Sequence, residues 1–198
     1  MNDYCIDLSL DINPLADGVS FASLPAKPFV PLGEDKLNPV LVKMYKDLGL
    51  VTEELAIIFS LPSNRTNSIH NDVEIENGDI AKINWSYSPN HTMNWYRTLE
   101  NRTREPVLMV DHGLCEPGCA TCGRSGKYFR YYSEQVEIIH SQVVGKPSLI
   151  QAGIPHNVEN FNGIRRCVSF AMMRESNGTV TPVTFAEAKE MLAKYLVG

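Results

Sequence analysis

The sequence predicts a mainly β protein with a helix before the strands and another after them. Short runs of β-branched and aromatic residues alternate with turn residues such as Asn77-Gly78 and Asn162-Gly163. This spacing is typical of an antiparallel sandwich or jelly roll, and not of a βαβ fold. The predicted strands are Ala56–Leu61, Ile80–Tyr87, Pro106–Asp111, Tyr128–Tyr132, Val136–Val144, Ser148–Ala152 and Arg165–Met172.

Helical segments and an arm flank this core, and all belong to one domain of residues 1–198. The first 34 residues contain four prolines and predict an extended, mostly irregular arm. Apolar residues then recur at helical spacing, which predicts a helix over 35–49. A β core of residues 55–172 follows. A C-terminal helix is expected over 184–197, where a capping box precedes apolar residues at helical spacing.

Composition and charge exclude several classes of protein. The chain has 198 residues, with 18 basic against 23 acidic side chains and a net charge of −5. Nucleic acid is not the expected partner, because neutralising phosphates requires a basic surface. No apolar run approaches the roughly 18 residues of a membrane span. The N-terminus lacks a secretory signal, so the five cysteines are expected to be reduced in a cytoplasmic protein.

A histidine and carboxylate pattern carries the chemistry. His70 and Asp72 are two residues apart, so in an extended segment both side chains project from the same face. Taken alone, a His-x-Asp pair is more often part of a polar surface loop. His156 lies 84 residues beyond the aspartate, and Arg165 follows nine residues later. Two imidazoles and a carboxylate on one side of Fe(II) leave three positions open. A guanidinium can hold the far carboxylate of a keto-acid co-substrate.

This pattern resembles the double-stranded β-helix dioxygenases that use Fe(II) and 2-oxoglutarate. The resemblance covers about residues 55–172 and is carried by His70, Asp72, His156, Arg165 and Ser169. It implies that the first three residues bind iron, that the arginine binds 2-oxoglutarate and that the serine is its hydroxyl partner. The implied reaction hydroxylates an amino-acid or peptide side chain or a small molecule. Substrate contacts are expected from residues 88–105 and 1–34, because barrel mouths are built from connections.

Strand alternation selects Arg165 over its neighbour as the anchor. The residues two and four positions after it share its face, whereas Arg166 faces the other way unless a bulge exchanges the two. The segment of residues 80–87 is similar to the branch with aspartyl/asparaginyl and prolyl hydroxylases and small phage or marine-microbial relatives. Within it, Asn84 or Tyr87 could line the keto-acid pocket, and an aromatic core strand is the alternative.

A second resemblance, to cupins, agrees on the barrel and on the two histidines. Four residues fit the spacing of the second cupin motif: Gly145, Gly153, His156 and Asn160. A cupin has no need of a cation at Arg165, so this residue favours the oxygenase. A cupin-type metalloprotein that acts without 2-oxoglutarate, and a non-catalytic ligand-binding barrel, remain alternatives.

The densest set of metal-binding side chains lies elsewhere in the chain. It consists of His112, Cys115, Cys119 and Cys122. Three thiols and an imidazole could hold a structural Zn²⁺ in tetrahedral geometry. The Cys-x3-Cys-x2-Cys spacing matches no common zinc knuckle, so a loop with free thiols is the alternative.

Overall fold

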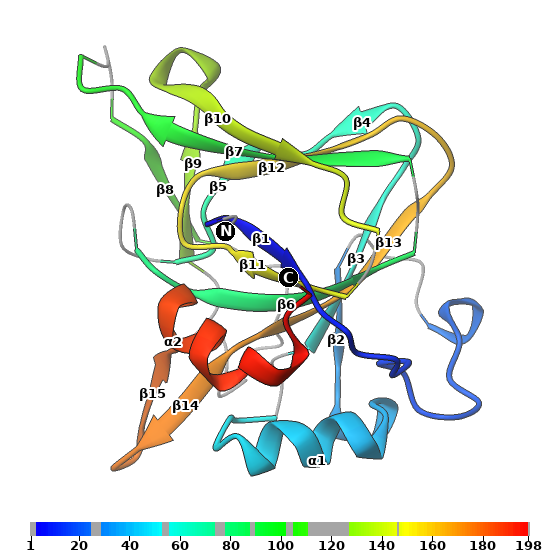
Figure 1. The fold of residues 1–198 in the computed structure, drawn as a ribbon. Helices are drawn as coiled ribbons and strands as arrows, with labels where there is room; N and C mark the ends of the chain where they lie inside the picture. The colour runs from blue at the N-terminus through cyan, green and yellow to red at the C-terminus, as the bar shows by residue number, and fades with distance from the viewer. Residues whose placement is uncertain are drawn as a thin grey trace.

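The computed structural model describes residues 3–24, 29–52, 56–73, 78–87, 90–101, 105–110, 127–145 and 147–197. Two antiparallel sheets, one above the other in Figure 1, contain most of the strands in this part of the chain. The mainly β prediction is therefore confirmed.

Four of the six strands in the first sheet were predicted from the sequence. Its order is β1 (Cys5–Asp7), β11 (Ser148–Gln151), β6 (Ala81–Ser86), β13 (Arg165–Ala171), β3 (Ala56–Leu61) and β2 (Phe29–Leu32). The two edge strands, β1 and β2, come from the arm that was expected to be mostly irregular. Each is a strand because its backbone pairs with a neighbour, as Cys5 does opposite Ile150 in β11.

The second sheet includes part of a segment, residues 88–105, that was expected to be a substrate-binding loop. Its order is β10 (Val136–Gln142), β7 (His91–Thr98), β12 (His156–Asn160), β5 (Ile69–His70), β9 (Lys127–Tyr131) and β8 (Val107–Val110), and β4 (Arg65–Thr66) also pairs with β12. Much of the expected 88–105 loop is therefore strand β7, in which Trp95 is fully buried. Asparagines obscure the strand pattern in β7 and β12. Asn94 Nδ2 donates to Asn157 Oδ1 at 2.9 Å across the two strands, which satisfies these side chains within the sheet.

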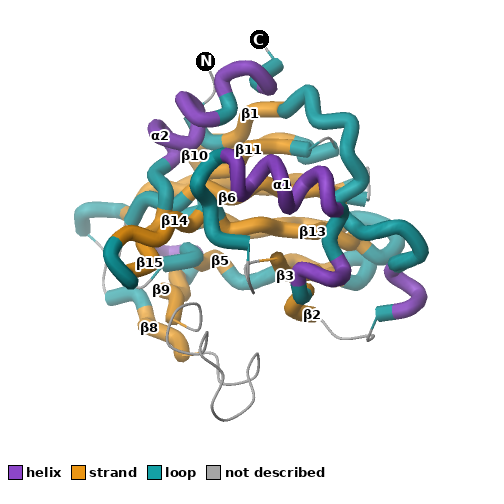
Figure 2. Tube along the Cα trace, turned by 90° about the horizontal axis from the view of Figure 1, so that it is seen from below, coloured by secondary structure: helices purple, strands orange, loops and turns teal. Residues whose placement is uncertain are grey.

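Two helices cover the outer face of the first sheet, as Figure 2 shows from below. They are α1 (Pro39–Asp47) and α2 (Phe185–Met191), and both are shorter than predicted. α1 starts late because the Asn38 side chain caps it, accepting a hydrogen bond from the Val40 N–H at 2.9 Å. The 184–197 helix changes after α2 into a short 3₁₀ helix at Ala193–Tyr195.

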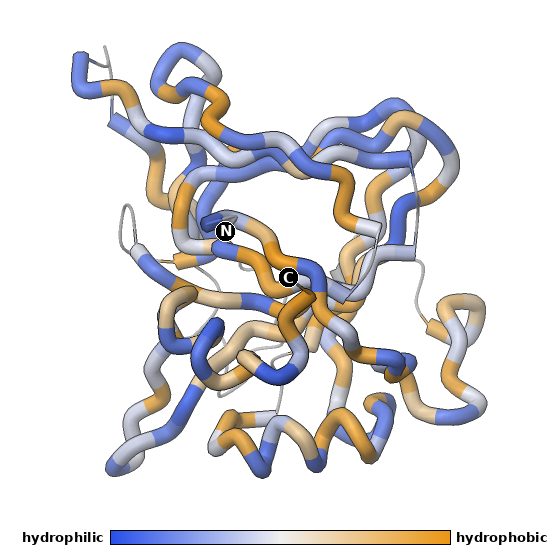
Figure 3. The backbone as a smooth tube through the Cα atoms, viewed as in Figure 1, coloured by the Kyte–Doolittle hydropathy of each residue, from blue (hydrophilic) through white to orange (hydrophobic). Residues whose placement is uncertain are grey.

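Strand alternation in the first sheet separates core from cavity. In β6, Ala81, Ile83 and Trp85 face the helices and join the main hydrophobic core. Lys82 and Asn84 therefore point toward the second sheet, and both line a cavity between the sheets. Figure 3 shows hydrophobic residues along α1 and the first sheet, whereas the strands at the top of the view are largely hydrophilic.

A close backbone approach at Gly153 provides a test of the packing beside this cavity. A Cβ atom here would clash with the carbonyl oxygen of Gly78 and would lie 2.8 Å from the Cα of Asp79. We expect Gly153→Ala to lower the free energy of unfolding by about 1–3 kcal/mol, because backbone must move. Gly145→Ala is the matched control, since a Cβ at Gly145 meets nothing within 4 Å. Equal unfolding midpoints in urea for the two variants would contradict this prediction.

Candidate metal centre

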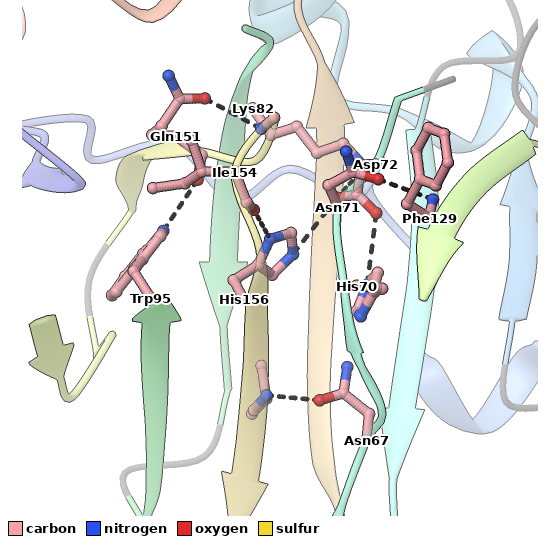
Figure 4. A network of polar contacts seen from close by, with 12 residues as sticks. Asn67, His70, Asn71, Asp72, Lys82, Trp95, Phe129, Gln151, Ile154 and His156 are labelled. Carbon is pink, nitrogen blue, oxygen red and sulfur yellow. Dashed lines mark hydrogen bonds and ion pairs between the residues drawn. The ribbon is translucent and has the colours of Figure 1, made fainter. Parts of the chain in front are cut away.

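The three predicted metal ligands come together at the junction of two paired strands. His70 ends β5 and His156 begins β12, and the two residues are direct partners in the sheet. Asp72 follows β5, where its backbone N–H donates to the carbonyl of Ala152 at 3.0 Å. One ligand atom from each of the three side chains lies within 4.8 Å of the others. Figure 4 shows the three side chains turned toward one another.

The residue between the first two ligands fixes their orientation. Asn71 is fully buried and points away from them, as alternation requires. The side-chain Oδ1 of Asn71 accepts a hydrogen bond from the backbone N–H of Phe129 at 2.8 Å, and the backbone N–H of Asn71 donates to the carbonyl of Phe129 at 3.1 Å. This double attachment to β9 leaves His70 and Asp72 on the cavity side (Figure 4).

Backbone carbonyls determine which ring nitrogen of each histidine is free. Nδ1 of His70 lies 2.7 Å from the carbonyl oxygen of Ser68, and Nδ1 of His156 lies 2.9 Å from that of Ile154. A carbonyl can only accept, so each Nδ1 carries the proton and each Nε2 presents a lone pair. The Nε2 atoms lie 3.4 Å and 3.6 Å from the two carboxylate oxygens of Asp72.

This arrangement suits a metal cation, because two lone pairs and a carboxylate face one another. Burial lowers the pKa of His156 to about 4, so this ring is neutral at physiological pH. Burial also opposes a charge on His70, but the hydrogen bond and negative charge of Asp72 outweigh it and raise the pKa of His70. Burial would raise the pKa of Asp72, yet Lys82 and the histidines hold it well below its usual value. His70 is therefore the one of the two histidines that takes up a proton more readily.

We expect metal binding to release a proton and to tighten as the pH rises. The carboxylate of Asp72 is already ionised and His156 is already neutral, so only His70 must lose a proton. Because the pKa of His70 is raised, protons compete with the metal more strongly as the pH falls from about 8 to about 5. Calorimetry with Mn²⁺ in buffers of different ionisation enthalpy measures this release. The same affinity across this range would contradict the prediction.

A lysine that sequence reasoning missed also belongs to the site. Lys82 extends from β6, and its Nζ lies 2.8 Å from Oδ2 of Asp72 (Figure 4). The available signal was its position two residues before Asn84, between the buried apolar residues Ala81 and Ile83. A lysine in such a strand has to point away from the core.

The predicted anchor lies in the wall of the same cavity. The Arg165 side chain is buried, with the residue only 4% exposed, and its Nε makes no hydrogen bond to the described part of the chain. Among the described residues, no carboxylate forms an ion pair with this guanidinium. Burying a charge without a partner is costly, so the site favours an anionic ligand.

The register of β13 separates the two neighbouring arginines. The strand pairs with β3 and β6 without a bulge, so alternation holds along its length. Arg166 accordingly lies on the other face, with its guanidinium 5.2 Å from the centre of the Phe21 ring. Ser169 faces the cavity together with Arg165.

Of the two candidate pocket residues, Asn84 in β6 lines the cavity, and Tyr87, which follows β6, does not. Asn84 pairs with Ser169 in the sheet, and its buried Oδ1 has no hydrogen-bond partner among the described residues. Tyr87 is 46% exposed, and its hydroxyl donates to Oδ1 of Asn13 at 3.3 Å. Tyr87 therefore does not line this cavity, because it lies three positions after Asn84 and strand alternation turns it to the opposite face.

The remaining sequence predictions and the comparisons add no further constraint. The possible zinc ligands His112, Cys115, Cys119 and Cys122 lie outside the described residues, so that site stays a prediction. In the described part of the chain, no helix has the length and apolar character to cross a membrane. Comparison with protein-family models finds no match, and comparison with curated proteins finds none. The function therefore has to follow from the geometry of the site.

Proposed function

We propose that the protein is an Fe(II)- and 2-oxoglutarate-dependent oxygenase. One observation carries this proposal: a ligand set of two histidines and an aspartate shares a cavity with the buried guanidinium of Arg165, which has no carboxylate partner among the described residues. The ligand set alone suits many metalloproteins. The guanidinium adds the requirement for a carboxylate some distance from the metal, and a dicarboxylate such as 2-oxoglutarate meets it.

The strand order supports a double-stranded β-helix as the scaffold. Four strands of the core lie in the first sheet in the order β11-β6-β13-β3, and four lie in the second in the order β10-β7-β12-β5. In each set, a strand from late in the core lies between two earlier ones. The cavity between the two sheets contains both the ligand set and the anchor.

The order of residues along β6 and β13 suits a ligand that reaches from the metal to the anchor. Lys82 lies opposite Ala171 in the sheet and Asn84 lies opposite Ser169. Along the cavity wall, Lys82 is therefore further from Arg165 than Asn84 is. Arg165 and Ser169 are four positions apart, or about 13 Å along the strand. The long arginine side chain reduces the distance that a bound ligand has to span. Arg165 would hold the far carboxylate, while Asn84 and Ser169 offer hydrogen bonds between the two ends.

The chain supplies binding, orientation and a water-poor cavity for this chemistry. His70, Asp72 and His156 would hold the metal, and a set of three protein ligands would leave positions for the keto acid and dioxygen. When bound, Fe(II) and 2-oxoglutarate supply the means to insert one oxygen atom of O₂ into a C–H bond, with succinate and CO₂ as coproducts. Apolar residues in the cavity wall, including Met93, Ile150 and Val158, exclude water.

Anaerobic calorimetry of the Fe(II)-loaded protein with 2-oxoglutarate tests the proposal. We expect 2-oxoglutarate to bind, and to bind much more tightly than succinate, which has two carboxylates but no keto oxygen to chelate the metal. Metal binding without 2-oxoglutarate binding would contradict the oxygenase and favour the cupin-type alternative. If binding is found, mass spectrometry of candidate amino acids and peptides would seek a product heavier by one oxygen atom.

A further inference from the structure

One carboxylate oxygen of Asp72, Oδ2, is already paired with Lys82 in this structure. The Lys82 Nζ lies 2.8 Å from Oδ2, and the two side chains are only 13% and 19% exposed. The ammonium also lies over the Phe59 ring, 5.9 Å from its centre. The contact is thus a partly buried, charge-assisted hydrogen bond, which is stronger than a bond between neutral groups.

We infer that Lys82 is a positioning residue that holds Asp72 to a single metal–oxygen bond. A carboxylate can bind a metal through one oxygen or through both. Here Oδ2 is engaged by Lys82 and lies 3.6 Å from Nε2 of His156, whereas Oδ1 lies 3.4 Å from Nε2 of His70 and has no lysine contact. Oδ1 is therefore the oxygen that we assign to the metal. The inference rests on the proposed function, in which the keto acid needs two open positions and dioxygen needs one.

Loss of the lysine would change the site in a way that loss of stability would not. Without Lys82, no ammonium competes with the metal for the carboxylate of Asp72. Both carboxylate oxygens can then bind the metal. The metal would then bind more tightly, while one of the three open positions would be closed to 2-oxoglutarate. A lysine that merely supported the fold would have the opposite effect on the metal, because a loosened site binds it more weakly.

The test compares Lys82→Met, which removes the ammonium, with Lys82→Arg, which retains a cationic donor. In Lys82→Met we expect about tenfold tighter Co²⁺ binding without 2-oxoglutarate, or about 1.4 kcal/mol. We expect about tenfold weaker 2-oxoglutarate binding to the Co²⁺-loaded protein, together with a changed visible spectrum of the bound Co²⁺. Lys82→Arg should restore all three properties. Lys43→Met is a matched control, because Lys43 pairs with Asp47 at 2.7 Å on the surface.

Each outcome supports or overturns the inference. Weaker Co²⁺ binding in Lys82→Met, or unchanged binding and spectrum, would overturn it. If Lys82→Met does not fold, Lys82→Gln keeps a neutral donor and is expected to show the same changes in part; wild-type behaviour of Lys82→Gln would count against the inference. If the wild-type protein binds Co²⁺ but not 2-oxoglutarate, the proposed function fails, while the metal affinity and spectrum still test the role of Lys82.

Discussion

Replacement of Asp72 by alanine is expected to abolish stable metal binding. Asp72 is the one carboxylate in the metal-binding group that the described residues form, and it balances the charge of Lys82. Without it, two neutral imidazoles remain beside an unpaired ammonium. We expect the affinity for Mn²⁺ to fall by about 100-fold or more, beyond the usual effect of removing a residue that only supports a ligand. Metal content after dialysis and calorimetry measure this loss.

The control for Asp72→Ala is a histidine outside the ligand set. His140 stacks on Tyr4, with ring centres 5.4 Å apart, and we expect His140→Gln to retain wild-type metal content. Asp72→Asn preserves the shape of the side chain and should lose the metal as well, which separates loss of charge from loss of packing. One equivalent of metal retained by both Asp72 variants would show that the metal binds elsewhere.

Replacement of Arg165 by methionine is expected to separate co-substrate binding from metal binding. The metal ligands are untouched, so the affinity for Mn²⁺ should stay within a few-fold of wild type. Binding of 2-oxoglutarate should weaken at least about tenfold, because hydrogen bonds to charged groups contribute about 1.5–3 kcal/mol each. Calorimetry on the metal-loaded proteins measures both affinities.

Arg166→Met is the matched control for this substitution. Arg166 lies next in the chain but on the opposite face of β13, against Phe21. Weakened 2-oxoglutarate binding in Arg166→Met alone would reverse the assignment of the anchor. Because the guanidinium of Arg165 is buried and no carboxylate of the described residues pairs with it, we also expect Arg165→Met to leave the metal-free protein at least as stable as wild type. Clear destabilisation would mean that Arg165 has a structural role.

The parts of the fold that could be predicted from the sequence are those with strong local periodicity. Strands β6 and β13 alternate buried apolar residues with cavity residues, and α1 repeats apolar residues at helical spacing. Strands β7 and β12 could not be predicted in this way. Their buried asparagines, Asn94 and Asn157, resemble loop residues until they pair with each other across the sheet. Partners 63 positions apart leave no local pattern.

The candidate site likewise combines features that could be predicted from the sequence with features that only the tertiary structure shows. The sequence by itself determined that His70 and Asp72 share a face and that Arg165 and Ser169 share another, because alternation depends only on neighbouring residues. Only the tertiary structure decided that His156 pairs with His70, that Lys82 reaches Asp72, and that Arg165 is buried with no carboxylate partner in the described part of the chain. The physical reason is that strand pairing and burial depend on groups distant in the chain, and the pairing of β5 with β12 brings together ligands 86 residues apart.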